Sequence, residues 1–382
     1  MTCNDLGFYL VNGLKYHNKI QALQACKNNE MPQWIFQDEK FSKHNWEIEP
    51  TEDIYELYKQ RAMQIRLKYD RVVLYYSGGI DSTCVLHSFI DNNIPLDGIV
   101  SYGAFNIKNY DQYDRNKEIA RVAQPYIRKL ELERGIKLPY YLLDDWELFL
   151  KKFNDESWSI DTNPTSMSPE THIWNFHREH SYFQNHLMKG TTAVIRAMDK
   201  PRIIFENGTW KIAFLDANAN GLFSTNASLN PTESLYHEYF YWTGDFPKIL
   251  CKQAHIVSQY FESLNDSELV DRLFSRSSKK FKSSEYFKWI DPIIYSRYLT
   301  NKPGEARNYF TLGKTKRTHA WHKDDVFFQH ADEKIQIIWR EGIKYAMNTI
   351  DPMYLNCEDD LSLENFITTG FRGIWTRDYN IK

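Results

Sequence analysis

The chain has 382 residues, of which 42% are apolar and 25% are charged. These values are typical of globular proteins, so they exclude a disordered chain, a collagen-like repeat and a disulfide-stapled miniprotein. No apolar run approaches the roughly 20 residues that a bilayer span requires, and the first residues lack the order of a signal peptide. The five cysteines form no C-x-x-C pair, which favours a reducing compartment over a structural zinc site. We therefore expect a soluble cytoplasmic protein without a membrane partner.

The net charge of −3 gives no overall bias toward nucleic acid, but one stretch is strongly basic. Residues 271–323 contain 13 Lys or Arg and four Asp or Glu, with aromatic residues between the cations. This mixture is typical of surfaces that bind polyanions, and it also fits a solvated basic face above buried aromatic side chains. A nucleotide or a nucleic acid is therefore a candidate partner. The cations considered for the anionic end of a substrate are Arg307, Lys314, Lys316 and Arg317.

The first 50 residues are expected to form a small lead-in element. An apolar strand at 8–11 ends in the turn dipeptide Asn12-Gly13, and a helix follows at 17–27. The next helix begins near Thr51, which is its predicted N-cap.

From residue 71 onward, strands and helices alternate. Apolar strands are predicted at 71–76, 98–102 and 138–143, and each is followed by a segment with helical spacing. Pro125 is expected to kink the second of these helices. Strand–helix alternation implies a parallel sheet that is covered on both faces by right-handed crossovers. The pattern therefore predicts an α/β fold with a doubly wound parallel sheet.

The later part of the chain changes character. Residues 154–190 are polar and rich in histidine, so a loop or insertion is expected there. Apolar runs at 202–205 and 211–215 flank Asn207-Gly208, which predicts a β-hairpin. Farther on, the spacing of apolar residues is mainly helical. The predicted organisation is a lead-in element of residues 1–50, an α/β domain of residues 51–230 and a mainly helical substrate or partner domain of residues 231–382.

A glycine loop follows the strand at 71–76 directly. Its two glycines permit unusual backbone dihedral angles, so that consecutive N–H groups can point at one anion. The next helix adds the positive end of its dipole, and hydroxyl groups add further donors. The loop therefore predicts a nucleotide phosphate site, with an unliganded glycine turn as the alternative. The residues concerned are Ser77, Gly78, Gly79, Ile80, Asp81, Ser82 and Thr83.

The hexapeptide at 77–82, Ser-Gly-Gly-Ile-Asp-Ser, resembles the signature of the PP-loop ATP pyrophosphatases, the adenine nucleotide alpha hydrolase superfamily. The resemblance covers about residues 51–150. It is closest to the synthetase domain of asparagine synthetase, and the chain also looks like PP-loop proteins of large tailed bacteriophages, which would place it in the host cytoplasm. The resemblance implies a doubly wound, parallel, five-stranded sheet of the HUP type, whose first loop grips the pyrophosphate of ATP.

The activity that this resemblance implies is cleavage of ATP between the α and β phosphates, with ATP and Mg²⁺ as cofactors. A substrate oxygen attacks the α-phosphorus to form an adenylate, and a nitrogen or sulfur nucleophile then displaces AMP. The strand at 98–102 and the residue after it would line the adenine, through Ser101, Tyr102 and Gly103. Thr2 stands where asparagine synthetases have a nucleophilic cysteine, and the S-G-D-G-x-D-E-L segment is absent. A glutaminase domain is therefore not expected.

Several other residues have candidate roles near the loop. Asp81 would repel a bare phosphate, so we expect it either to cap the helix or to help hold Mg²⁺. Asp144 and Asp145 end the third strand, at the edge where open α/β sheets bind ligands. Each is a candidate Mg²⁺ ligand, and Asp145 is equally explained as a helix N-cap. Lys200 is a candidate α-phosphate ligand or a lysine at a helix C-terminus, and Cys84 is expected to be a small buried residue.

These features predict an AMP- and pyrophosphate-forming ligase, with Asp81 and Lys200 as catalytic residues. It would adenylate a carboxylate or carbonyl oxygen of a small-molecule acceptor for attack by an amine or ammonia. An enzyme that amidates or thiolates a nucleobase is an alternative, although the absence of a C-x-x-C pair argues against thiolation. A nucleic-acid-binding protein with an inert nucleotide loop is an alternative of another class. It would bind nucleic acid with a steep salt dependence and without ATP turnover.

Overall fold

The structure of the chain is a computed structural model. The residues that it describes are 7–27, 30–103, 105, 118–144, 146–153, 190–197, 202–216, 235–276, 283–305, 330–355, 362–363, 365–366 and 370–381. Among these residues, no helix has the length and apolar character needed to cross a bilayer. The polar segment expected at 154–190 lies outside them, apart from its last residue.

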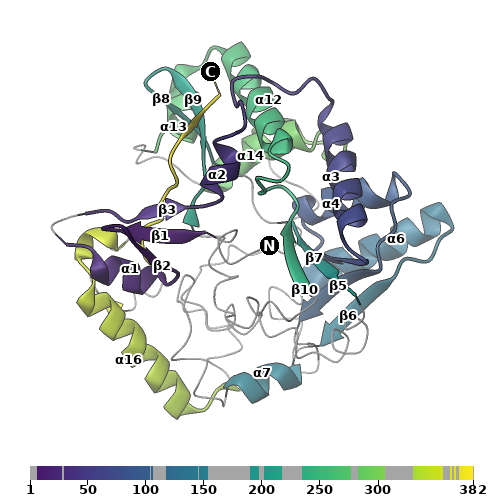
Figure 1. The fold of residues 1–382 in the computed structure, drawn as a ribbon. Coiled ribbons are helices and arrows are strands. Elements are labelled where there is room, and N and C mark those ends of the chain that lie inside the picture. The colour runs from purple at the N-terminus through teal and green to yellow at the C-terminus, as the bar shows by residue number, and fades with distance from the viewer. Residues whose placement is uncertain are drawn as a thin grey trace.

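A five-stranded parallel sheet carries the candidate site (Figure 1). From its first strand the chain moves outward through two neighbours, and it then returns to the other side of the first strand, so the strand order reverses there. Open α/β sheets bind ligands at the carboxyl ends of the strands beside such a reversal. In spatial order the strands are β10 (Leu235–Tyr239), β7 (Thr192–Arg196), β4 (Arg71–Tyr75), β5 (Gly98–Gly103) and β6 (Tyr140–Asp144).

The predicted α/β class and parallel sheet are confirmed, and the strand order is compatible with a Rossmann-like fold. Strands β7 and β10, however, were not recognised in the sequence. β10 lies beyond residue 230, where a mainly helical domain was expected, so the parallel sheet continues past the predicted domain boundary. Its Glu238 interrupts the apolar pattern of the strand, because that carboxylate is buried with a partner from a distant helix.

Three helices pack against one face of the sheet: α3 (Ile54–Lys68), α4 (Ile80–Ile90) and α6 (Gln124–Arg134). Their buried side chains share one core with strand residues such as Leu74 and Ile99. The predicted start of α3 was wrong by two residues. Asp53 is the N-cap, and its carboxylate accepts the Tyr55 N–H at 2.8 Å, whereas Thr51 precedes the helix.

A π-helical turn, η3 (Ile119–Ala123), leads into α6. Pro125 lies in the first turn of α6, where its missing N–H costs no helical hydrogen bond. The irregularity that we expected as a kink at this proline is therefore a wider turn in front of it. Such π-turns are often found beside functional sites.

The lead-in element is a small antiparallel sheet with two short helices. The expected strand, turn and helix are present, and Asn12 and Gly13 both have positive φ, as a type I′ hairpin requires. Two further short strands were not predicted. The elements are β1 (Phe8–Val11), β2 (Leu14–Tyr16), β3 (Gln33–Ile35), α1 (Lys19–Ala25) and α2 (Asp38–Phe41).

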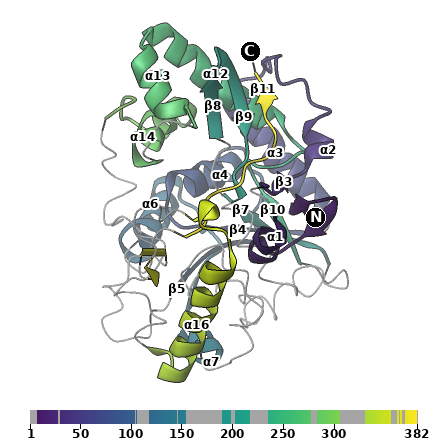
Figure 2. The same ribbon diagram turned by 90° about the vertical axis from the view of Figure 1, so that its left-hand side faces the viewer.

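A third sheet joins the predicted hairpin to the end of the chain. Strands β8 (Arg202–Glu206) and β9 (Thr209–Ala213) flank the turn at Asn207-Gly208, and β11 (Tyr379–Asn380) adds to β9. Figure 2 shows this sheet gathered with α12, α13 and α14, away from α7 and α16. The bounds are α7 (Trp146–Phe153), α12 (Lys248–Leu264), α13 (Ser267–Phe274), α14 (Ser283–Ile294), α16 (Glu333–Thr349) and the short η7 (Pro352–Tyr354).

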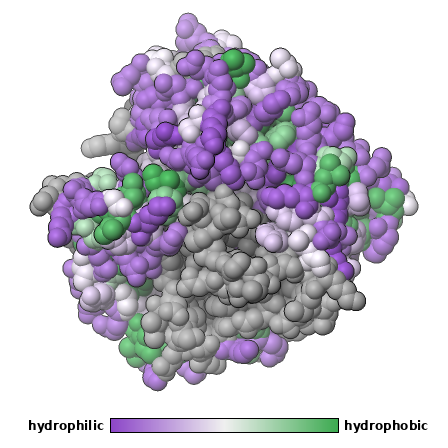
Figure 3. All heavy atoms as spheres, in the orientation of Figure 1, coloured by the Kyte–Doolittle hydropathy of each residue, from purple (hydrophilic) through white to green (hydrophobic). Residues whose placement is uncertain are grey.

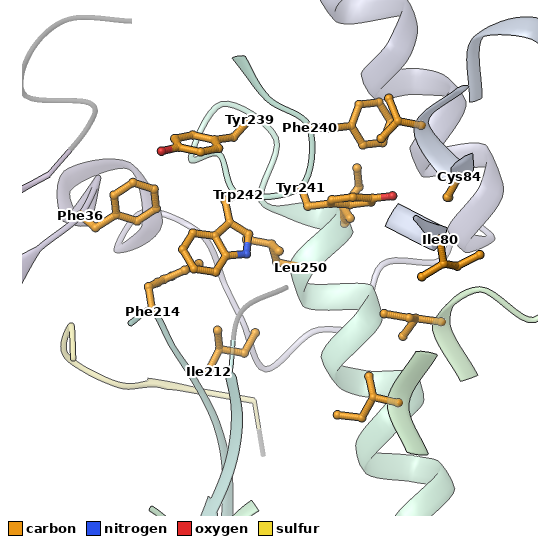
Figure 4. Close-up of a cluster of buried hydrophobic side chains, with 14 of the residues drawn as sticks. Phe36, Ile80, Cys84, Ile212, Phe214, Tyr239, Phe240, Tyr241, Trp242 and Leu250 are labelled. Atoms are coloured by element: carbon orange, nitrogen blue, oxygen red, sulfur yellow. The ribbon is translucent and has the colours of Figure 1, made fainter. Parts of the chain in front are cut away.

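Aromatic side chains join the three sheets into one core (Figure 4). The ring of Phe36, after β3, lies 5.5 Å from that of Phe214 and 6.2 Å from that of Tyr239, measured between centroids. The centroid of the Trp242 ring also lies 5.9 Å from that of Phe36. The described surface in Figure 3 is mainly hydrophilic, with only small scattered apolar patches on that face. Many of the described aromatic residues are thus used for internal packing.

A buried ion pair ties β10 to α3. The guanidinium of Arg61 lies 2.8 Å from the carboxylate of Glu238, and both side chains are 1% exposed. Arg61 also donates to the carbonyl of Tyr239 at 2.8 Å. Lys68 donates to the second carboxylate oxygen at 2.8 Å, and the Tyr69 hydroxyl donates to the same oxygen. The edge strand of the parallel sheet is therefore held by charge as well as by backbone pairing.

This network predicts acid-sensitive stability. Burial raises the pKa of Glu238, but Arg61, Lys68 and Tyr69 together outweigh burial and lower that pKa to about 2. A carboxylate with a lowered native pKa stabilises the fold above its unfolded pKa, and this stability is lost as the pH falls toward the native value. We expect Glu238 to contribute on the order of 3 kcal/mol at neutral pH, lost between about pH 5 and pH 2.

Urea unfolding at a series of pH values, with the wild type and Glu238→Gln side by side, measures this contribution. The variant should be less stable at pH 7 and should depend less on pH below 5, because the titrating group is gone. Equal acid dependence of the two proteins would show that other carboxylates dominate the transition.

Candidate functional site

The glycine loop leaves the carboxyl end of β4, beside the reversal in strand order. The Tyr76 N–H donates to the Val100 carbonyl at 2.8 Å, so pairing with β5 continues up to the first loop residue. Gly79 is the N-cap of α4, which starts at Ile80. The predicted strand–loop–helix arrangement is confirmed. The first N–H groups of a helix have no acceptor within the helix, so the start of α4 is suited to an anion.

Gly78 brings the loop against the π-turn η3. Its φ is +80°, a value that residues with a side chain rarely adopt. A Cβ atom at this position would lie 2.9 Å from the backbone nitrogen of Ala123 and 3.0 Å from its Cα. Both the backbone conformation and the close approach therefore require glycine here.

The hydroxyl groups of the loop divide into one exposed and two buried groups. Ser77 is exposed, and its Oγ accepts the Gly79 N–H at 3.3 Å. Ser82 is buried and donates to the Gly79 carbonyl at 3.0 Å. Thr83 is also buried, and its Oγ1 lies 3.3 Å from the hydroxyl of Tyr76. Ser82 and Thr83 thus maintain the shape of the loop, whereas Ser77 presents its hydroxyl at the surface.

Asp81 connects the loop to the helical part of the molecule. Its carboxylate accepts the hydroxyl of Tyr295, the residue after α14, at 2.5 Å. Its carbonyl accepts the hydroxyl of Tyr241 at 3.0 Å. Burial, with the Asp81 charge beside it, raises the pKa of Tyr295, so this phenol remains a donor. Cys84, one turn along α4, is fully buried as expected, and Figure 4 shows Tyr241 pointing toward it.

The residues proposed to line adenine lie on both faces of β5. Ser101 is 1% exposed, and its hydroxyl donates at 2.5 Å to the carbonyl of Tyr76, so it supports the base of the loop. Tyr102 is half-buried on the other face, with its ring 5.3 Å from that of Tyr75. Gly103 ends the strand at the carboxyl edge. One adenine could not contact both side chains, so backbone atoms would have to make part of that contact.

Asp144 ends β6 and is engaged by two backbone groups. Its Oδ1 accepts the N–H of Phe105 at 3.0 Å and that of Trp146, the first residue of α7, at 3.1 Å. It therefore supplies the side-chain oxygen at the start of α7 that we expected of Asp145. The described residues contain no group of three or more His, Cys, Asp or Glu side chains that could hold a metal ion. A cation at this edge would need ligands from its substrate as well.

Several predicted site residues lie outside the described residues: Lys200, Asp145, Arg307, Lys314, Lys316 and Arg317. Two described arginines of the basic stretch take part in internal ion pairs. Arg272 lies 3.1 Å from Glu285. Arg276 lies 2.7 Å from both Glu206 and Asp378, which ties α13 to β8 and to the C-terminal segment. These two cations hold the fold together.

Arg196 is a candidate that sequence reasoning missed. It is the last residue of β7, and its guanidinium lies 5.4 Å from the centroid of the Tyr75 ring, next to the loop. The signal was a cation directly after the apolar run Ala-Val-Ile, at a strand end where α/β sheets bind ligands. It was overlooked because β7 itself was not predicted.

A cavity of about 260 Å³ lies at the opposite end of α4 from the loop. The helix has 11 residues, so the two places are separated by about 16 Å along its axis. The cavity is lined by the start of α3, the end of α4 and the turn after α14, and it is separate from the loop site. Its lining residues include Asp53, Glu56, Asp91, Arg297 and Tyr298.

The comparisons with known proteins add no relative from which a role could be transferred. No family model matches the sequence, and no curated protein matches it significantly. The features that indicate a nucleotide site are therefore the hexapeptide and its place in the fold.

The contact between Gly78 and η3 predicts an unequal response to two alanine substitutions. Gly208 has a similar φ of +75°, but a Cβ there would meet no atom within 4 Å. Gly208→Ala should lower the free energy of unfolding by about 1–2 kcal/mol, the cost of a left-handed backbone conformation alone. Gly78→Ala should cost roughly 1–3 kcal/mol more, because the new methyl group collides with Ala123. Urea unfolding of the two variants measures the difference. Equal losses of stability would show that the loop can shift away from Ala123 without cost.

Proposed function

We propose that the chain is an ATP-dependent ligase of the PP-loop pyrophosphatase type, with a sheet of the HUP class. It would adenylate a carboxylate or carbonyl oxygen of a small-molecule acceptor, and an amine or ammonia would complete the product. One observation carries this proposal: the Ser-Gly-Gly-x-Asp-Ser loop lies at the carboxyl end of β4, at the start of α4 and beside the reversal in strand order. The supply of ATP fits the cytoplasmic location that we propose with it.

The loop has the donors that a leaving pyrophosphate needs. The exposed hydroxyl of Ser77, the backbone at Gly78 and the first N–H groups of α4 would face the same anion. These groups are held in place before a ligand arrives, by Ser82, by Thr83 and by the contact of Gly78 with η3. Donors fixed in advance stabilise developing charge without reorganisation, which is the main source of catalysis at such sites.

The acidic residues present fit Mg²⁺ bound with a polyphosphate. Mg²⁺ at such sites takes one or two carboxylates and completes its shell with phosphate oxygens and water, so it does not need the three-residue cluster that the described residues lack. Asp81, in the first turn of α4, is the proposed ligand, and Tyr295 orients its carboxylate. Asp144 is the second candidate. When bound, the ion would supply charge neutralisation of the phosphates.

The proposed reaction proceeds in two displacements. An acceptor oxygen forms a bond to the α-phosphorus, and the bond from that phosphorus to the bridging oxygen breaks, so pyrophosphate leaves with the electron pair. The amine then attacks the activated carbon, AMP leaves, and the amine loses one proton. The task of the chain is to orient the acceptor and the α-phosphate in line. Lys200 is the proposed α-phosphate ligand.

The ion pairs of Arg272 and Arg276 give no support to a nucleic-acid partner at those positions.

Exchange of radiolabelled pyrophosphate into ATP tests the adenylation step without a nitrogen donor. With Mg²⁺ and pools of carboxylic acids as acceptors, we expect exchange without an amine, and AMP and pyrophosphate as products once an amine or ammonia is added. Ser77→Ala and Asp81→Asn should each lower the exchange rate by roughly 10- to 1000-fold, because each removes a group that faces the reacting phosphates.

The matched control is Ser263→Ala, which removes an exposed hydroxyl at the end of α12 and should leave the exchange rate unchanged. Production of ADP and phosphate in place of AMP would contradict the proposed bond cleavage. Calorimetry that detects no ATP binding to the folded wild type would exclude the nucleotide site altogether.

A further inference from the structure

A row of three side chains crosses the sheet next to the loop. Leu74 of β4 is in register with Ile195 of β7, so the next residues, Tyr75 and Arg196, are neighbours, and the guanidinium lies over the Tyr75 ring. On its other side Arg196 is in register with Tyr239 of β10. Register partners on adjacent parallel strands point to the same face. Tyr75, Arg196 and Tyr239 therefore form a row at the carboxyl edge, on the face opposite α3 and α4.

Two buried polar atoms of this row have no hydrogen-bond partner in the part of the chain that the structure describes. They are the Nε of Arg196 and the hydroxyl oxygen of Tyr239, a residue that is only 2% exposed. Among the described residues, no carboxylate forms an ion pair with Arg196. Buried donors without acceptors cost free energy, and native structures rarely keep them without a reason. Two such donors on register partners, at the edge where α/β sheets bind ligands, indicate that a ligand supplies the acceptor.

The two groups influence each other electrostatically. Burial raises the pKa of the Tyr239 phenol, and the positive charge of Arg196 opposes that effect. The phenol therefore remains protonated and can donate a hydrogen bond. A single anionic group between the two side chains could accept from both.

We propose that Arg196 and Tyr239 bind a carboxylate group of the acceptor substrate. The planar fork of a guanidinium matches a carboxylate in two parallel hydrogen bonds, and the phenol adds another donor. Stacking on Tyr75 holds the plane of the guanidinium in place. A carboxylate carries one negative charge, which this single cation balances, whereas a phosphate dianion would leave excess charge at a largely buried position. The assignment of this carboxylate to the acceptor rests on the proposed function, whereas the subsite itself rests on the two donors without acceptors.

Thermal unfolding of the full chain in sodium acetate, compared with sodium chloride at equal ionic strength, tests the subsite. A bound anion stabilises the native state in a saturable way, and the midpoint shift yields the acetate dissociation constant. Arg196→Gln should raise this constant more than tenfold. Tyr239→Phe should raise it roughly three- to tenfold. Because the Tyr239 hydroxyl has no partner among the described residues, this second variant should unfold at the wild-type temperature in chloride.

Arg71→Gln is the matched control, because Arg71 begins β4 on the same face at the opposite edge. Its midpoint shift in acetate should equal that of the wild type.

The proposal is overturned if acetate and chloride have the same effect on the wild type. It is also overturned if Tyr239→Phe and Arg196→Gln show the wild-type midpoint shift in acetate. Loss of ATP or pyrophosphate affinity in Arg196→Gln with acetate binding intact would overturn it too, by assigning the cation to the nucleotide. If Arg196→Gln loses acetate binding and the wild type binds no ATP, the subsite is supported and the proposed function alone is rejected.

Discussion

The candidate site depends on one contact between two backbones. Gly78 and the π-turn η3 approach so closely that no side chain fits between them, and the left-handed conformation of Gly78 directs the chain from β4 into α4. This contact sets the start of α4 and turns Ser77 outward. Asp81 follows in the first helical turn, where Tyr295 and Tyr241 bond to it. These two hydrogen bonds fix the helices after β10 relative to the loop, so a displacement of the loop would also displace the end of α14.

The two sides of the strand reversal offer different chemistry. After β4 the donors are backbone N–H groups, a hydroxyl and a helix dipole, which suit a phosphate chain. At the ends of β7 and β10 the donors are a guanidinium and a phenol, which suit a planar anion. The second set depends on the placement of β10, because Tyr239 lies beside Arg196 only if that strand is paired with β7. The buried pair of Arg61 and Glu238 secures that placement from the other face of the sheet.

Local signals in the sequence were sufficient for the loop and its surroundings. The apolar run of β4, the two glycines and the helical spacing of α4 are adjacent in the chain, and the hairpin at Asn207-Gly208 is equally local. The strands β7 and β10 were missed because each includes a charged residue, Arg196 or Glu238, whose surroundings come from distant segments. The caps that Asp144 and Asp53 supply, in place of the expected Asp145 and Thr51, reflect local geometry that composition cannot resolve.

The π-turn has a consequence for the permitted length of the chain. A π-turn contains one residue more than the α-helical turn that would replace it. Removing a single amino acid between Ile119 and Ala123 would restore regular winding and rotate one side of the helix by about 100° relative to the other. Ala123 would then swing away from the glycine that it touches. Deletions within this helix should thus be tolerated far less well than substitutions, even though none of its residues belongs to the hexapeptide.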